Sequence, residues 1–153
     1  MLFTSPPKYM VLDAKGFQKV QATELFEYIK QAVSHYKEAL PTHHKPHFLD
    51  EDTCLATTLN THKFILINGE YLLAYSVSNY WYSRKKVLNE EYLYRVAQGP
   101  TTLKDVRKVL SSLAKLHGCM EAQVGTLAVS NQQAASRLYK AAGFKPLLQV
   151  MRC

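Results

Sequence analysis

Histidine and cysteine side chains could bind a metal or act as nucleophiles. His43, His44 and His47 form an HHxxH pattern in a loop bracketed by prolines. A zinc site would need Cys or carboxylate partners at defined spacing, or the glutamate of an HExxH pattern, and the sequence has neither there. Cys119 has no His and acid pair set around it, so a buried thiol explains it better than a nucleophile. We therefore expect no metal site and no cysteine chemistry.

An aromatic run followed by cations is a second candidate. Tyr80-Trp81-Tyr82 precedes Arg84-Lys85-Lys86, and such interleaving is typical of surfaces that bind single-stranded nucleic acid. In a strand, alternation would send Tyr80 and Tyr82 to one sheet face and Trp81 to the other. A half-buried strand that ends in a basic turn accounts for this run better.

The net charge of the chain also suggests an anionic partner, but it does not identify which one. Nineteen Lys and Arg against twelve Asp and Glu give a formal charge of +7. This surplus attracts phosphates, nucleic acids or acidic protein surfaces. A solvated basic face is the alternative, so nucleic acid remains an open but disfavoured partner.

Length and composition indicate a single domain over residues 1–153. The chain has 47% hydrophobic residues, six Gly and six Pro, and a chain near this length buries roughly two-thirds of its unfolded surface. No apolar run approaches the roughly 20 residues of a membrane helix, and two prolines stand where a signal peptide would be apolar. Three cysteines are an odd number. We therefore expect that the chain has no membrane segment, that its thiols are free and that it is located in the cytoplasm.

Residue spacing predicts two helices and then a hairpin. Apolar residues recur at helical spacing over 23–40, and the acidic run Asp50-Glu51-Asp52 could open a second, short helix. Residues 63–68 and 71–81 are rich in Ile, Val, Tyr and Leu. They flank Asn68-Gly69, which accepts the positive φ of a type I′ turn.

Three more strands and two helices are predicted after the hairpin. Alternation favours a strand over 87–96, and Leu and Val at three- and four-residue steps favour a helix over 101–118. A strand over 121–129, a helix over 131–142 and a closing strand over 147–151 follow. The order α-α-β-β-β-α-β-α-β predicts an α/β fold of the α+β kind, with a mixed sheet and helices on both faces.

The end of the sequence carries a recognisable motif. In LAVSNQQAASRLYKAAGFKPLLQV, Asn131 opens a helix that ends in Leu138-Tyr139 and Gly143-Phe144. This string resembles the C-terminal signature of the GNAT superfamily of acyl-CoA N-acyltransferases, and the likeness covers roughly residues 91–151. The resemblance implies a twisted, mostly antiparallel central sheet. In it, two neighbouring strands splay apart and admit the pantetheine arm of acetyl-CoA.

The resemblance also implies a turn that binds the CoA diphosphate through backbone N–H groups at a helix N-terminus. Counting back from Gly118 places this turn at 98–103, where Thr101 and Leu103 replace the small residues of the family. An ordinary Gly-Pro turn with a Thr N-cap is the alternative. Asn131 lies one residue further from Gly143 than in the family, so it could be only an N-cap. The residues assigned to acetyl-CoA are Val96, Ala97, Gln98, Gly99, Thr101, Thr102, Lys104 and Asn131.

Catalytic roles follow from the same likeness. Tyr139 would donate a proton to the departing thiolate, with a packed core tyrosine as the alternative. Glu90 and Glu91 lie on the strand where many members place a base, and alternation would let only one face the cleft. Glu91 is the preferred base. Backbone N–H groups near Val96 and Ala97, left unpaired by the splaying, would polarise the thioester oxygen.

Two functions remain open at this point. The first is an N-acetyltransferase that moves acetyl from acetyl-CoA to an amine, on a protein or a small molecule, by direct attack in a ternary complex. The resemblance implies that the N-terminal helices and loops, residues 23–59, build the acceptor side. The second is a catalytically silent protein that has lost acetyl-CoA binding, similar to acetyltransferase-like proteins of tailed bacteriophages, which work in the host cytoplasm or the virion. Exposed strand edges make a homodimer reasonable in either case.

Overall fold

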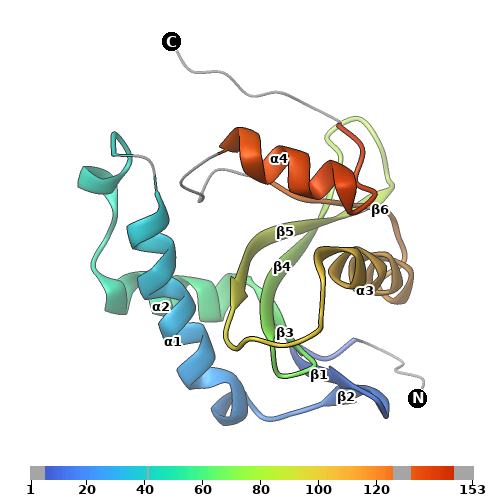
Figure 1. Cartoon of the computed structure of the whole chain (residues 1–153), viewed down its shortest axis with the longest axis horizontal. Helices are drawn as coiled ribbons and strands as arrows, with labels where there is room; N and C mark the ends of the chain where they lie inside the picture. Colours follow the sequence, from blue (N-terminus) through green and yellow to red (C-terminus); the bar gives the residue numbers. More distant parts are fainter. Residues whose placement is uncertain (1–5, 41, 126–131, 147–153) are drawn as a thin grey trace.

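A computed structural model of the chain describes residues 6–40, 42–125 and 132–146. Six strands form one sheet in the order β2-β1-β3-β4-β5-β6 (Figure 1). The strands are β1 (Tyr9–Asp13), β2 (Gly16–Lys19), β3 (Lys63–Ile67), β4 (Tyr71–Asn79), β5 (Lys86–Arg95) and β6 (Cys119–Gln123). The helices are α1 (Ala22–Ala39), α2 (Glu51–Thr61), α3 (Leu103–Leu116) and α4 (Gln132–Ala141), with a short 3-10 turn at Lys45–His47.

The sheet is mixed, which confirms the expected α/β class. β1 pairs antiparallel with β2, β3 with β4, and β4 with β5. β1 and β3 run parallel, as do β5 and β6. The parallel pairs are joined through helices, because parallel strands need long crossover connections.

The N-terminal hairpin was not anticipated, so the predicted element order was incomplete at its start. β1 is held by β3, with Met10 opposite Ile65, and this partner lies far away in the sequence. Gly16 has a φ of 94°, a value that glycine adopts without strain and that lets the chain reverse into β2. Two strands of five and four residues are too short for a strong alternation signal.

Most of the other predicted boundaries lie close to the observed ones. β4 ends at Asn79, before the aromatic run that was expected to belong to it. β6 begins at Cys119 and ends at Gln123, so the strand expected over 121–129 starts two residues early. Residues 126–129 of that strand and the closing strand over 147–151 lie outside the described residues.

Helices cover both faces of the sheet (Figure 1). On one face Leu25, Ile29 and Ala32 of α1 pack against Phe64, Leu72 and Ala74. On the other face the apolar side of α3 packs against the opposite sides of the same strands. The α3 residues in this second core are Val106, Val109, Leu110, Leu113 and Ala114. Each fully buried Leu or Ile stabilises the fold by ~1.5–3 kcal/mol.

The hairpin between β3 and β4 follows the predicted turn. Asn68 and Gly69 have φ values of 53° and 67°, and the N–H of Glu70 donates to the carbonyl of Ile67 at 2.9 Å. Positive φ at both central residues is the mark of a type I′ turn. The turn places Glu70 at the end of the β3–β4 hairpin, where it contacts the loop before α3.

Within the described ranges, no helix combines the length and the hydropathy that crossing a membrane requires.

Candidate active-site cleft and the closed turn before helix α3

β5 and β6 pair over only the first part of β5, and the point where this pairing ends is called their divergence. β5 pairs with β4 from Lys86 to Arg95, but it pairs with β6 only until Asn89 meets Gln123. From Glu90 onward β5 has no β6 partner among the described residues. The pairing thus ends toward the carboxyl end of β6, and ligands bind at the carboxyl ends of parallel strands in open α/β sheets.

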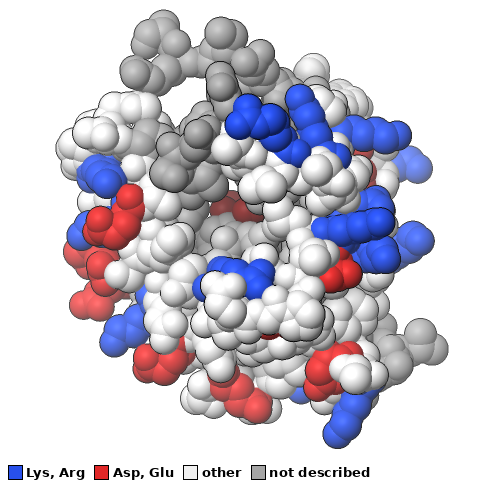
Figure 2. Space-filling model, in the orientation of Figure 1, with Lys and Arg blue, Asp and Glu red and all other residues white. Residues whose placement is uncertain are grey.

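A cleft of about 260 Å³ opens at this divergence. Its wall includes Tyr36 of α1 and Glu90 and Glu91 of β5. Gly125, which follows β6, and Tyr139 of α4 also line it. Figure 2 shows this face of the molecule hollowed near its centre, with acidic atoms inside the hollow. The cleft therefore brings two glutamates together with four tyrosines, Tyr36, Tyr92, Tyr94 and Tyr139.

Glu90 has the electrostatics of a general base. Burial raises the pKa of Glu90 to about 7, the nearby charge of Glu91 adds to this rise, and a hydrogen bond from the backbone of Gly125 opposes it. The Gly125 N–H donates to Glu90 Oε2 at 3.1 Å. A base works best when its pKa lies near the working pH, so Glu90 is suited to remove a proton at neutral pH.

The expectation that only one of the two glutamates faces the cleft was wrong. Glu90 pairs with Tyr75 and Tyr92 pairs with Ala74, so Glu91 lies in a β-bulge without a partner on β4. An extra residue in one strand breaks the two-residue alternation. Both glutamates therefore line the cleft, and Ser76 Oγ donates to Glu91 Oε1 at 2.5 Å.

Tyr139 reaches the same cleft from α4. Its half-buried ring meets Phe144 edge-on, with 5.2 Å between the ring centroids. Burial raises the pKa of Tyr139 well above its usual value, and the charges of Glu90 and Tyr71 raise it further. The phenol therefore stays protonated at neutral pH and has a proton to give, while its raised pKa makes it a weaker acid than an exposed tyrosine. The Leu-Tyr motif had predicted this residue, whereas Tyr36 of α1 was not anticipated.

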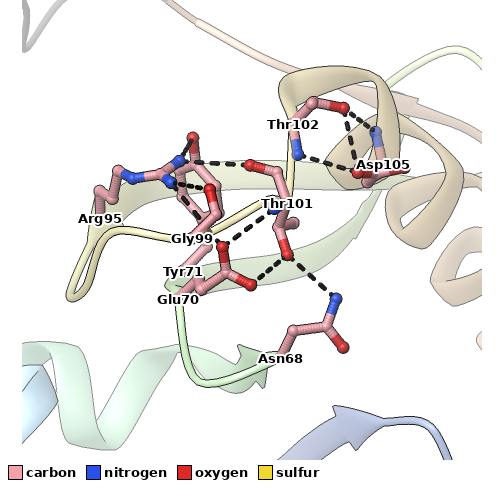
Figure 3. Close-up of polar contacts among 8 residues, drawn as sticks. All are labelled: Asn68, Glu70, Tyr71, Arg95, Gly99, Thr101, Thr102 and Asp105. Atoms are coloured by element: carbon pink, nitrogen blue, oxygen red, sulfur yellow. Dashed lines mark hydrogen bonds and ion pairs between the residues drawn. The ribbon is translucent and has the colours of Figure 1, made fainter.

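The turn before α3 is closed by a carboxylate of the chain itself (Figure 3). The Thr101 N–H donates to Glu70 Oε1 at 2.9 Å, and Thr101 Oγ1 donates to Glu70 Oε2 at 2.5 Å. Asn68 Nδ2 donates to Thr101 Oγ1 at 3.1 Å. Both Glu70 and Thr101 are buried, and the bonds from Thr101 lower the pKa of Glu70. A charged carboxylate thus takes up the N–H that was assigned to a diphosphate.

Arg95 fastens the same turn from the other side (Figure 3). Its guanidinium donates to the carbonyls of Gly99 and Thr101, at 2.8 and 3.3 Å, and to the hydroxyl of Tyr71. It also lies 3.7 Å from Glu70 Oε1 and stands over the Tyr71 ring. A Cβ at Gly99 would overlap the Glu70 carboxylate, so a larger residue there would displace that side chain from the turn.

The expected oxyanion donors also have internal partners. The N–H groups of Val96 and Ala97 donate to the carbonyl of Glu70, at 2.8 and 3.4 Å. The expectation that splaying leaves them unpaired was wrong, because the hairpin turn places Glu70 against the end of β5. No local pattern could have predicted this contact, since Val96 and Ala97 lie 26 and 27 positions after Glu70 in the chain.

The remaining predicted cofactor residues are distributed around this closed turn. Thr102 is the N-cap of α3, with its N–H donating to Asp105 Oδ2 at 2.9 Å and its Oγ1 accepting from the Asp105 N–H. Gln98 and Lys104 are exposed. Asn131 lies outside the described residues. Asn68, Glu70 and Arg95, the three residues that close the turn, were not among the site residues predicted from the sequence.

A second hollow of about 220 Å³ approaches β5 from the side of α1 and α2. It shares Tyr36, Glu91 and Tyr92 with the larger cleft. Apolar side chains such as Val33, Phe48 and Leu49 form much of its wall. The two hollows therefore meet at the bulge of β5.

The fold and the cleft define a mixed α/β protein with an acidic cleft beyond the point where two parallel strands stop pairing. In the part of the chain that the structure describes, no three His, Cys, Asp or Glu side chains lie together as metal ligands. Comparisons with protein-family models, curated proteins and solved structures found no match to this chain.

Proposed function

We propose that the chain is an N-acyltransferase that passes the acetyl group of acetyl-CoA to an amine of a protein or a small molecule. The observation that carries this proposal is the pairing of Glu90 and Tyr139 in one cleft at the divergence of β5 and β6. One is a carboxylate with a pKa of about 7, and the other is a phenol that stays protonated. The resemblance of the C-terminal motif to the GNAT superfamily supports the same proposal.

The chemistry needs one base and one acid. Glu90 takes a proton from the ammonium group of the acceptor, and the freed nitrogen lone pair attacks the thioester carbonyl carbon. Collapse of the tetrahedral intermediate breaks the carbon–sulfur bond, and Tyr139 gives its proton to the departing thiolate. As the intermediate collapses, the nitrogen loses its second proton to solvent, so that a neutral amide forms. The amide and the free thiol leave, Glu90 releases its proton to solvent and Tyr139 takes one from solvent, so each turnover sets free one proton. Holding both reactants in one cleft supplies the orientation that direct attack requires.

The two hollows suit two reactants. The larger cleft, between β5 and α4, would take the acyl thioester arm. The smaller hollow, under α1 and α2, would admit the amine. Glu91 and Tyr36 line both, so the reacting atoms would meet there. The apolar wall of the smaller hollow favours an amine on an apolar or aromatic framework.

The closed turn limits how the nucleotide end of acetyl-CoA can bind. Because Glu70 is charged and holds the Thr101 N–H, a diphosphate gains no hydrogen bond there and is repelled. Lys104 is exposed in the first turn of α3 and outside this closure. We therefore expect acetyl-CoA to bind through its pantetheine arm and only weakly through its phosphates.

The same contact favours a second candidate function. A turn whose anion site is filled by the chain's own carboxylate is what a protein that has lost acetyl-CoA binding would show. Such a protein would keep the fold for a structural or interaction role, like the bacteriophage proteins that the sequence resembles.

Release of free thiol from acetyl-CoA in the presence of a panel of amines tests the first proposal. We expect turnover with the native chain and a drop of roughly 10²-fold or more for Tyr139→Phe, because general acid catalysis contributes that much. Tyr28→Phe, which changes a half-buried tyrosine of α1 outside the cleft, is the matched control. Unchanged turnover in Tyr139→Phe would remove this residue as the proton donor.

A further inference from the structure

The loop between β4 and β5 presents aromatic rings to solvent. β4 ends at Asn79, so Tyr80, Trp81 and Tyr82 lie outside the sheet, and the expectation of a half-buried strand there was wrong. Trp81 is 94% exposed and Tyr82 is 67% exposed. In Figure 1 this loop extends beyond the sheet at the upper right, near β6.

Contacts within the loop hold these rings in place. The rings of Tyr80 and Tyr82 stack with 5.2 Å between centroids, and Trp81 meets Tyr82 edge-on at 5.4 Å. The Tyr80 hydroxyl donates to the carboxylate of Glu121 and accepts from Gln123 Nε2 at 3.0 Å. These hydrogen bonds hold Tyr80 against β6. Trp81 and Tyr82, which contact each other and Tyr80, remain exposed to solvent.

Three cations follow the rings, separated from them in the chain by Ser83. Arg84, Lys85 and Lys86 are exposed, and none of them is in an ion pair with another described residue. The nearest acidic side chain on β6, Glu121, is already engaged by Tyr80. The loop therefore carries three positive charges that form no ion pair with the acidic side chains of the described residues, in a chain of net charge +7.

We propose that this aromatic and basic loop, residues 80–86, binds single-stranded nucleic acid. Bases would stack on Trp81 and Tyr82, and phosphates would lie against Arg84, Lys85 and Lys86. Stacking accepts every base because each has a π face, so we expect little sequence preference. Cations that form no ion pair, next to exposed aromatic rings, are complementary to a single strand of nucleic acid, in which bases alternate with phosphates. The site is independent of the acyl-transfer cleft.

Trp81 is the only tryptophan of the chain, so its fluorescence reports directly on this site. We would titrate the native chain with an oligothymidylate of about 12 nucleotides, at salt concentrations from about 50 to 200 mM. We expect quenching of Trp81 and an affinity that falls as salt rises. For Trp81→Ala, followed by anisotropy of a labelled oligonucleotide, we expect binding to weaken roughly tenfold or more.

Two variants of equal charge separate this loop from the general basic surface. One variant replaces Arg84, Lys85 and Lys86 with Gln. The other replaces Lys15, Lys19 and Lys30, which are exposed lysines of the β1–β2 hairpin and of α1, with Gln. The proposal predicts a shallower salt dependence and weaker binding for the first variant only. Equal weakening in both variants, or no quenching by the oligonucleotide at low salt, would overturn it. A blue shift of Trp81 with anionic phospholipid vesicles but no response to the oligonucleotide would overturn it in favour of a lipid surface.

Discussion

Glu90 is the residue on which the proposed chemistry depends. A carboxylate in water would be far too weak a base to deprotonate an amine efficiently, and burial in the cleft raises the pKa of Glu90 to about 7. The Gly125 N–H fixes one of its oxygens. Its place in the cleft could be predicted only in part, because the bulge at Glu91 is not visible in the sequence.

Turnover should therefore depend on the ionisation of Glu90. The carboxylate form is the active base, so we expect the rate to rise with pH through about 7 and to level off above it. Glu90→Gln should lower turnover by roughly 10²- to 10⁴-fold and abolish this rise. A pH profile of thiol release checks both expectations. Glu38→Gln, at an exposed position of α1, should keep the native profile. A profile that survives in Glu90→Gln would assign the base elsewhere.

Glu90 should also make the folded protein less stable as the pH rises, which is opposite to the usual effect of a carboxylate. The pKa of Glu90 is higher in the folded chain than the value of about 4.3 in an unfolded chain. The folded state therefore binds the proton more tightly, and the stabilisation present below pH ~4.3 is lost as the pH rises through 7. Glu90→Gln should thus melt at a higher temperature than the native chain at pH 8, and at nearly the same temperature at pH 4. Equal melting differences at both pH values would contradict a raised pKa.

Among the elements, those with local signals could be predicted and those with distant partners could not. The periodicity of α1 and α3 and the Asn68-Gly69 turn each depend on a few neighbouring residues, and all three are observed. β1 depends on β3, which lies about 55 residues away. Glu70 meets Thr101 across 31 residues. The helices could therefore be predicted from the sequence, whereas the contact between Glu70 and Thr101 that closes the turn could not.

Helix α3 begins at a reciprocal cap that is separate from the Glu70 closure. Thr102 Oγ1 accepts from the Asp105 N–H, while Asp105 accepts from the Thr102 N–H. Replacing a Thr N-cap by Ala costs about 1 kcal/mol, so we expect Thr102→Ala to lower the free energy of unfolding by about that amount. Urea denaturation measures this change. Ser112→Ala, in an exposed middle turn of the same helix, is the control and should not destabilise. A native unfolding free energy for Thr102→Ala would show that the cap is not needed.

In the whole molecule, positive charge and the cleft occupy different regions of one face. Lys and Arg gather over the part where α3 and α4 lie, whereas the hollow beside them holds acidic atoms (Figure 2). The exposed cations of these helices are Lys104, Lys108, Lys115, Arg137 and Lys140. A basic surface around an acidic cleft would attract an anionic donor from a distance. It would also leave the cleft itself suited to a cationic amine.

The central claim is that the cleft at the divergence of β5 and β6 admits an acyl thioester although Glu70 closes the neighbouring turn. Isothermal calorimetry with acetyl-CoA tests it most directly, on the native chain and on Glu70→Gln, whose amide oxygen can still accept from the Thr101 N–H. We predict measurable binding to the native chain and tighter binding to Glu70→Gln, because that change removes a negative charge beside the diphosphate. Heat from Glu70→Gln alone would support loss of acetyl-CoA binding in the native chain. No heat from either protein at millimolar acetyl-CoA would contradict the account.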